Sequence, residues 1–156
     1  LGAVWALGYF ADFAQGGAAG IALGAPVGAF GAVSSRTDFP QPWYDTHQGL
    51  YPVFHVLRGL SRLRGQRMRE LALRQSGDLT GLAVETVDGV ELWLGNTGPE
   101  PTRVTLGASK TRLAVLDADS FEKAAHSAEF MDRLHDHDTS GLTLESFSIA
   151  RIQIKQ

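Results

Sequence analysis

The sequence contains no cysteine, and this absence excludes several chemistries. A disulfide framework, a metal site built on thiolates and a cysteine nucleophile all need that side chain. A chain without disulfides suits a reducing compartment, and we therefore expect a cytoplasmic protein.

An excess of charge of one sign is also missing. The 14 lysine and arginine residues nearly balance the 17 aspartate and glutamate residues, which gives a formal net charge of -3. Such a chain produces no field that would attract a phosphate backbone or an anionic lipid surface. We therefore expect neither a nucleic acid nor a membrane as partner.

The apolar N-terminal stretch, residues 1–13, is too short to span a bilayer, which takes about 20 residues. Asp12 interrupts it and no basic residue precedes it, so it is not typical of a signal peptide. Its first residues look like the middle of a helix without a capping residue. Since the chain also begins without methionine, we expect a fragment of a longer protein.

What the sequence does contain divides into two zones near Gly65. In residues 1–64, apolar residues at helical spacing are followed by Gly16-Gly17, a pair that ends helices. The short apolar segment 18–23 predicts a buried parallel strand, residues 24–49 a long loop, and residues 51–60 a second helix. This order of helix, strand, loop and helix is typical of a (β/α)8 barrel.

Beyond Gly65 the hydrophobic period changes from 3.6 to 2, which predicts an antiparallel β-sandwich in residues 65–156. Residues 119–137 are predicted to be helical or irregular, and the last strand is expected to close the sheet at the C-terminus. The predicted strands are Arg69–Arg74, Thr80–Thr86, Val90–Gly95, Thr102–Leu106, Thr111–Leu116, Leu142–Leu144 and Phe147–Ile154.

Four segments in this order resemble the C-terminal part of D-apionate lactonase-like proteins. They are Trp5–Gly8, Tyr51–Leu57, Leu92–Thr97 with Pro99–Pro101 after it, and Leu142–Leu144 continuing to Ala150–Ile152. The resemblance implies kinship with retaining (β/α)8-barrel glycosidases that carry an appended β-sandwich. Residues 1–64 would then be the last helices and a late strand of the barrel, and residues 65–156 the sandwich.

The resemblance also implies an activity, namely hydrolysis of a small sugar-derived lactone, such as apionolactone, to its acid without a cofactor. A retaining glycosidase needs two carboxylates about 5–5.5 Å apart. No aspartate or glutamate occurs between Phe13 and Arg36, where the matching barrel strand ends. The alternative is a catalytically degenerate relative of the glycosidases with a carbohydrate-binding or structural role.

The loop 24–49 combines aromatic, acidic, basic and imidazole side chains, which suits a pocket for a small carbohydrate or lactone. His47 could act as general base, Asp45 could hold its tautomer, and Arg36 could stabilise the oxyanion. Substrate contacts are predicted for Arg36, Asp38, Trp43 and Tyr44. The resemblance places the main catalytic residues upstream of this chain. The simpler interpretation is a polar surface loop whose aromatic residues pack on the barrel rim.

Other residues with chemical potential have simpler interpretations. We expect His55 to be a hydrogen-bonded packing residue, residues 135–138 to be a solvated loop and not a metal site, and Trp93 to pack inside and not to stack on sugar. The arginines between positions 58 and 69 would interact with a helix C-terminus. Apolar surface around Trp5, Leu23 and Leu57 predicts that the chain in isolation either associates with other chains or has a poorly ordered N-terminal zone.

Overall fold

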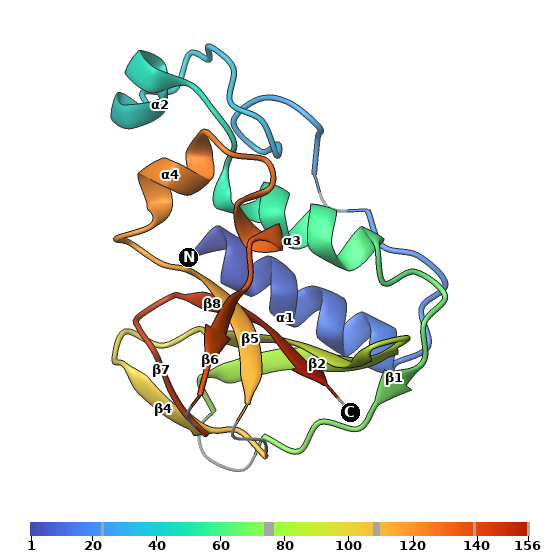
Figure 1. Cartoon of the computed structure of the whole chain (residues 1–156). Helices are drawn as coiled ribbons and strands as arrows, with labels where there is room; N and C mark the ends of the chain where they lie inside the picture. Colours follow the sequence, from blue (N-terminus) through green and yellow to red (C-terminus); the bar gives the residue numbers. More distant parts are fainter. Residues whose placement is uncertain (23, 74–76, 108–109, 139, 156) are drawn as a thin grey trace.

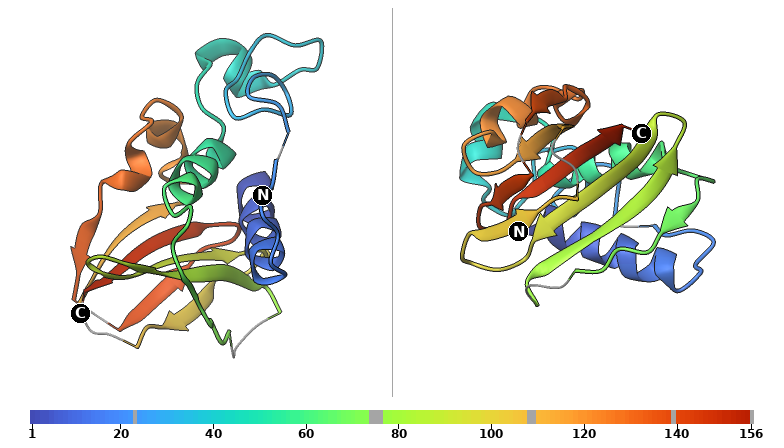
Figure 2. Two further views of the ribbon diagram at one scale, coloured as in Figure 1. Left: turned by 90° about the vertical axis from the view of Figure 1, so that its right-hand side faces the viewer. Right: turned by 60° about the horizontal axis from the view of Figure 1, so that its bottom comes forward.

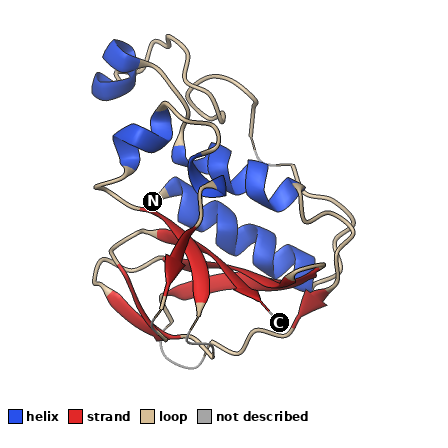
Figure 3. Ribbon diagram, in the orientation of Figure 1, coloured by secondary structure: helices blue, strands red, loops and turns tan. Residues whose placement is uncertain are grey.

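The computed structural model describes all residues except 23, 74–76, 108–109, 139 and 156. Its helical N-terminal part lies on one side of an antiparallel sheet (Figures 1 and 3). The helices are α1 (Gly2–Gln15), α2 (Pro42–His47), α3 (Pro52–Ser61), α4 (Phe121–Ala125) and the 3-10 turn η1 (Phe130–Asp132).

Helix α1 follows the predicted period, because Val4, Leu7 and Ala11 lie on one buried face. The helix ends as predicted at the glycine pair. Gly17 has a φ of 80°, which an L side chain rarely adopts. There the Gly17 N–H donates to the Ala14 carbonyl at 3.1 Å and the Ala18 N–H to the Phe13 carbonyl at 2.9 Å. This pair of hydrogen bonds is a Schellman motif.

The buried parallel strand predicted for residues 18–23 is wrong for the residues that can be judged. Residues 18–22 form no strand and are mostly exposed, and Leu23 lies outside the described residues. A parallel strand needs neighbouring strands that pair with its N–H and C=O groups. Among the described residues of 1–64 no such neighbour exists, so this segment has no ladder to join.

The long loop 24–49 is more structured than predicted, because it contains α2 and two isolated bridges. Val33 pairs with Val27 and with Leu50. The Ser34 N–H donates to the Gly49 carbonyl at 2.8 Å, so the middle of the loop is tied to its C-terminal end. Helix α3 then begins as predicted, with Pro52 in its first turn, where a missing N–H costs nothing.

The second zone forms two antiparallel sheets, as the alternating pattern predicted. The larger sheet has the order β1-β2-β3-β8-β5-β6, and β4 pairs with β7 in the smaller one. The strands are β1 (Met68–Arg69), β2 (Leu79–Thr86), β3 (Gly89–Asn96), β4 (Thr102–Thr105), β5 (Thr111–Leu116), β6 (His135–His137), β7 (Gly141–Leu144) and β8 (Ile149–Lys155).

Two details of the strand prediction are wrong. The strand predicted at 69–74 is limited to β1, since residues 70–73 form no strand and residue 74 lies outside the described residues. Residues 135–137 form the edge strand β6 instead of a loop. The last strand, β8, pairs with both β3 and β5 and lies in the middle of the sheet. Two flanking ladders satisfy its backbone groups, which explains its central place.

The larger sheet is buried on both faces. Leu92 and Leu94 of β3 pack with Leu142 and Leu144 of β7 in the core between the sheets. Trp93 points to the opposite face, where α1 and α3 cover the sheet (Figure 2). No helix within the described residues is long and apolar enough to cross a bilayer.

Candidate functional site

A cavity of about 590 Å³ opens beside α2 and brings together four of the six predicted site residues. It is lined by Arg36, Thr37, Asp38, Pro40, Tyr44, Asp45 and Gln48. Most of these side chains are polar or charged, so the cavity suits a small ligand with several oxygen atoms. Thr37 and Gln48 were not predicted as site residues, although both lie in the same polar loop.

Asp45 has a fixed place at this cavity. Its Oδ2 accepts a hydrogen bond of 2.8 Å from the Gln41 N–H, at the start of α2. This bond satisfies one of the backbone donors left free at a helix N-terminus. The Gln41 side chain in turn donates to the Thr37 hydroxyl at 3.3 Å. The loop therefore holds the carboxylate in place from one side.

Tyr44 forms an aromatic wall of the cavity. Its hydroxyl donates to the Leu50 carbonyl at 3.3 Å, and its ring centroid lies 4.4 Å from that of Tyr51. Burial raises the pKa of Tyr44 far above its usual value of 10, and the nearby Tyr51 raises it further. Tyr44 therefore stays protonated at neutral pH, and since its hydroxyl proton is donated to Leu50, the residue serves as a wall of the cavity and not as a base.

Trp43 and His47 are not among the residues that line the cavity. Their rings stack with centroids 4.8 Å apart, and His47 Nδ1 lies 3.0 Å from the Trp43 carbonyl oxygen. Trp43 also packs on Phe121 of α4 at 4.8 Å. Among the contacts of the described residues, no hydrogen bond joins Asp45 to His47. The predicted tautomer-holding pair is therefore replaced by two separate contacts with the backbone.

His55 is the packing residue that the sequence predicted. It is 1% exposed, and its Nε2 lies 3.0 Å from the Ala124 carbonyl oxygen. Burial lowers the pKa of His55, while this hydrogen bond and the charge of Asp132 oppose the shift in part. The ring is therefore neutral at pH 7, with Nε2 as the donor.

The other candidates of the second zone have structural surroundings. Trp93 is fully buried and its indole N–H donates to Glu91 at 2.8 Å, so the predicted internal packing is confirmed. His137 lies on β6 with Nε2 3.0 Å from the Gly141 carbonyl oxygen. Within the described part of the chain, no three histidine, aspartate or glutamate side chains lie close enough to hold a metal ion.

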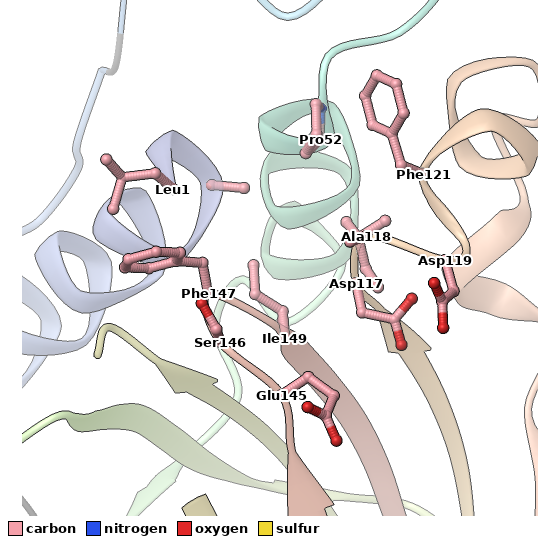
Figure 4. A pocket seen from close by; sticks show the side chains of 12 residues that line it. Leu1, Pro52, Asp117, Ala118, Asp119, Phe121, Glu145, Ser146, Phe147 and Ile149 are labelled. Carbon is pink, nitrogen blue, oxygen red and sulfur yellow. The ribbon is translucent and has the colours of Figure 1, made fainter. Parts of the chain in front are cut away.

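A second cavity, of about 610 Å³, lies between the N-terminal ends of α1 and α3 and the loops after β5 and β7 (Figure 4). Phe121 and Phe147 contribute two of its aromatic side chains. Asp117 faces it as well, but its Oδ1 already accepts a 2.8 Å hydrogen bond from the Ser120 N–H. No residue of this cavity was a sequence-based candidate.

Two family models match this chain. Residues 1–65 match the TIM barrel domain of D-apionate lactonase, and residues 76–152 match its C-terminal immunoglobulin-like domain. Together they leave only residues 66–75 and 153–156 unmatched. The chain belongs to the D-apionate lactonase family. The cavity beside α2 thus lies in the part of this family member that matches the barrel, and the two antiparallel sheets form its immunoglobulin-like domain.

One solved structure that the chain matches is a GH30 endoxylanase from Clostridium papyrosolvens. The two share 14% sequence identity with a TM-score of 0.49, over 69% of this chain and 28% of the endoxylanase chain. The D-apionate lactonase family member therefore spans less than a third of that protein. No curated protein sequence matches the chain.

Proposed function

We propose that the protein opens a small sugar-derived lactone, an aldonolactone such as apionolactone, and that the cavity beside α2 binds it. The observation that carries this proposal is the convergence of Arg36, Asp38, Tyr44 and Asp45 on one cavity. The family match supports the reaction class. Barrel enzymes place their chemistry on loops at one face of the barrel, and this loop lies within the residues that match the barrel domain.

The reaction needs a base, an oxyanion partner and a proton for the leaving group. In this proposal a carboxylate, Asp45 or Asp38, takes a proton from water, whose oxygen attacks the lactone carbonyl carbon. The Arg36 guanidinium stabilises the negative charge that develops on the carbonyl oxygen. The ring C–O bond then breaks, the ring oxygen receives the proton, and the product is an open hydroxy acid.

Asp45 is the better candidate for the base, because the Gln41 N–H fixes its orientation toward the cavity. Tyr44 supplies an apolar wall beside the sugar ring. His47 has no direct part in this version of the chemistry, since its ring packs on Trp43. Arg36 would also bind the carboxylate of the product through charge-assisted hydrogen bonds.

A second candidate function is carbohydrate binding or a structural role without turnover. The absence of aspartate and glutamate from residues 14–35 favours it, because a glycosidase-type site needs a carboxylate at the end of the barrel strand. In this case Arg36, Asp38 and Tyr44 would hold the ligand without activating water.

The test is lactone opening by the protein that carries this chain. The rate of acid release is measured at constant pH and compared with the rate of uncatalysed hydrolysis. We expect Asp45→Asn and Arg36→Ala each to lower kcat/KM by about 100-fold, the size of a lost general base or oxyanion partner. His47→Ala and the remote control Asp88→Asn should stay near wild type. Unchanged turnover in Asp45→Asn and Arg36→Ala would overturn the proposal. Calorimetric lactone binding without any turnover would favour the second function.

A further inference from the structure

The connection between β5 and β6, residues 117–134, leaves the immunoglobulin-like domain and packs on the part that matches the barrel (Figures 1 and 2). Two consecutive carbonyls at the end of α4 make the contact. The Ala125 carbonyl accepts the Leu50 N–H at 2.8 Å, and the Ala124 carbonyl bonds to His55 Nε2 at 3.0 Å. The connection is therefore fixed to Leu50, between α2 and α3, and to His55 of α3.

Gly49 shows how close this contact is. A β-carbon at position 49 would lie 2.5 Å from the Ala125 carbonyl oxygen, and Gly49 has a φ of 122°. Both facts exclude a larger residue at this point without a shift of the backbone. The C-terminal end of the loop 24–49 thus lies directly against the backbone of α4.

Phe121, the first residue of α4, extends the contact to α2 itself. Its ring centroid lies 4.8 Å from Trp43 and 5.8 Å from Tyr44, both in edge-to-face geometry. Such pairs add stabilisation beyond the apolar area that they bury. Because Tyr44 lines the substrate cavity, Phe121 lies one ring away from it.

Helix α2 depends on such support because it has only six residues and no buried residue of its own. Isolated helices shorter than about 12 residues are marginal in water. The contact with Phe121 is therefore a main source of its fixed position, together with the stacking inside the loop.

We propose that Phe121 is a positioning residue for the lactone site, through which the immunoglobulin-like domain holds α2 and the Tyr44 wall in place. The proposal rests on the proposed function for its effect on catalysis, but not for its effect on α2. Phe121 touches no substrate; it acts through Trp43 and Tyr44.

The test compares Phe121→Ala with Phe147→Ala in the protein that carries this chain. Both changes remove a phenyl ring from the second cavity, but Phe147 makes no ring contact with Trp43 or Tyr44 among the described residues. We expect Phe121→Ala to lower kcat/KM for the lactone about fivefold to tenfold, with a higher KM and a lower kcat, because α2 carries both the Tyr44 wall and the proposed base Asp45. Phe121→Leu, which keeps most of the volume, should restore both.

Amide hydrogen exchange gives a readout that does not depend on the reaction. The Asp45 and Gln48 N–H groups bond to the Gln41 and Tyr44 carbonyls at 2.8 Å each and report whether α2 is formed. Phe121→Ala should speed their exchange about tenfold while strands β3 and β8 keep their protection. Unchanged exchange at both amides, or equal effects from Phe147→Ala, would overturn the positioning role. If exchange rises while Arg36→Ala leaves turnover intact, positioning stands and the proposed lactone site fails.

Discussion

The Cα of Gly59 in α3 lies directly against the indole ring of Trp93 in β3. A β-carbon at position 59 would come within 2.1 Å of Trp93 Cζ2. Trp93 is fully buried, so the ring cannot move aside. The absence of a side chain at one helix position therefore sets how closely α3 approaches the sheet.

Gly59→Ala should lower the free energy of unfolding by about 1–3 kcal/mol, although alanine favours helices by about 1 kcal/mol. The clash outweighs propensity because the contact is with a rigid, enclosed ring. Denaturant unfolding measures the change. Gly2→Ala is the matched control, since nothing lies within 4 Å of a β-carbon there. Equal stability of both variants would show that α3 can shift on the sheet.

Asn96, at the end of β3, links three segments of the immunoglobulin-like domain. Its side-chain amide donates to the carbonyls of Glu100 at 2.7 Å and Leu144 at 3.1 Å, and its Oδ1 accepts the Gly98 N–H at 2.9 Å. The residue is fully buried. Its neutral amide supplies the donor that the surrounding carbonyls need.

Asn96→Asp should lower the free energy of unfolding by about 3 kcal/mol or more. The new carboxylate would face carbonyl oxygens in a buried site and could not donate the hydrogen bonds that the amide makes. Acidification should recover part of the loss, since a protonated carboxyl can donate again. Urea unfolding of the variant at neutral and acidic pH measures both effects. The matched control is Gln153→Glu, which makes the same change from amide to carboxylate at a half-buried position of β8. A loss independent of pH would argue against the carbonyl contacts as its cause.

Asp132 joins the two parts of the chain through charge. Its carboxylate contacts Arg58 of α3 at 3.2 Å, Arg62, and Arg151 of β8 at 2.9 Å. Burial alone would raise the pKa of Asp132, but the hydrogen bonds and charges of these arginines outweigh it and hold the pKa below its usual 3.8. The predicted basic run after α3 thus has an acidic partner from the second zone.

A carboxyl group whose pKa is lower in the folded than in the unfolded protein stabilises the fold at pH values above its pKa in the unfolded chain. This stabilisation is lost as the pH falls through the pKa of the folded state. Asp132→Asn should therefore lower the free energy of unfolding by about 2 kcal/mol at pH 7. This difference in stability from wild type should shrink below about pH 4. Chemical unfolding across this range measures it. Asp136→Asn removes an exposed partner of Arg112 and should change stability by less than about 0.5 kcal/mol. A constant difference down to pH 2 would contradict the ionic origin.

The hydrophobic period of the sequence predicted the antiparallel sheets well, because the alternation of apolar and polar residues indicates which face of each strand is buried. It failed at residues 18–22, where a strand depends on neighbours that local pattern does not contain. The composition of the loop identified Arg36, Asp38, Tyr44 and Asp45 as residues that converge. The contacts of Phe121 with Trp43 and Tyr44 could not be predicted, since the partners are 78 and 77 positions apart and only the tertiary fold brings them together.

Helix α1 carries an aromatic stripe opposite its buried face, formed by Trp5, Tyr9 and Phe13 at intervals of four residues. These side chains are 57%, 54% and 49% exposed, and Tyr9 stacks on Phe13 with centroids 5.5 Å apart. Leu57, predicted to be exposed with Trp5, is half-buried, and Leu23 lies outside the described residues. A contiguous apolar surface of this kind favours association.

The 156-residue polypeptide alone should therefore self-associate with rising concentration. Replacing two rings of the stripe by charge, as in Trp5→Glu with Tyr9→Glu, should shift it to monomer because like charges would then face each other across any contact between stripes. Light scattering over a concentration series measures this. Val87→Glu changes a fully exposed apolar residue in the turn between β2 and β3 and should leave association unaltered. A wild-type polypeptide that stays monomeric, with slow amide exchange throughout residues 1–60, would show that α1 is stable with its stripe in water.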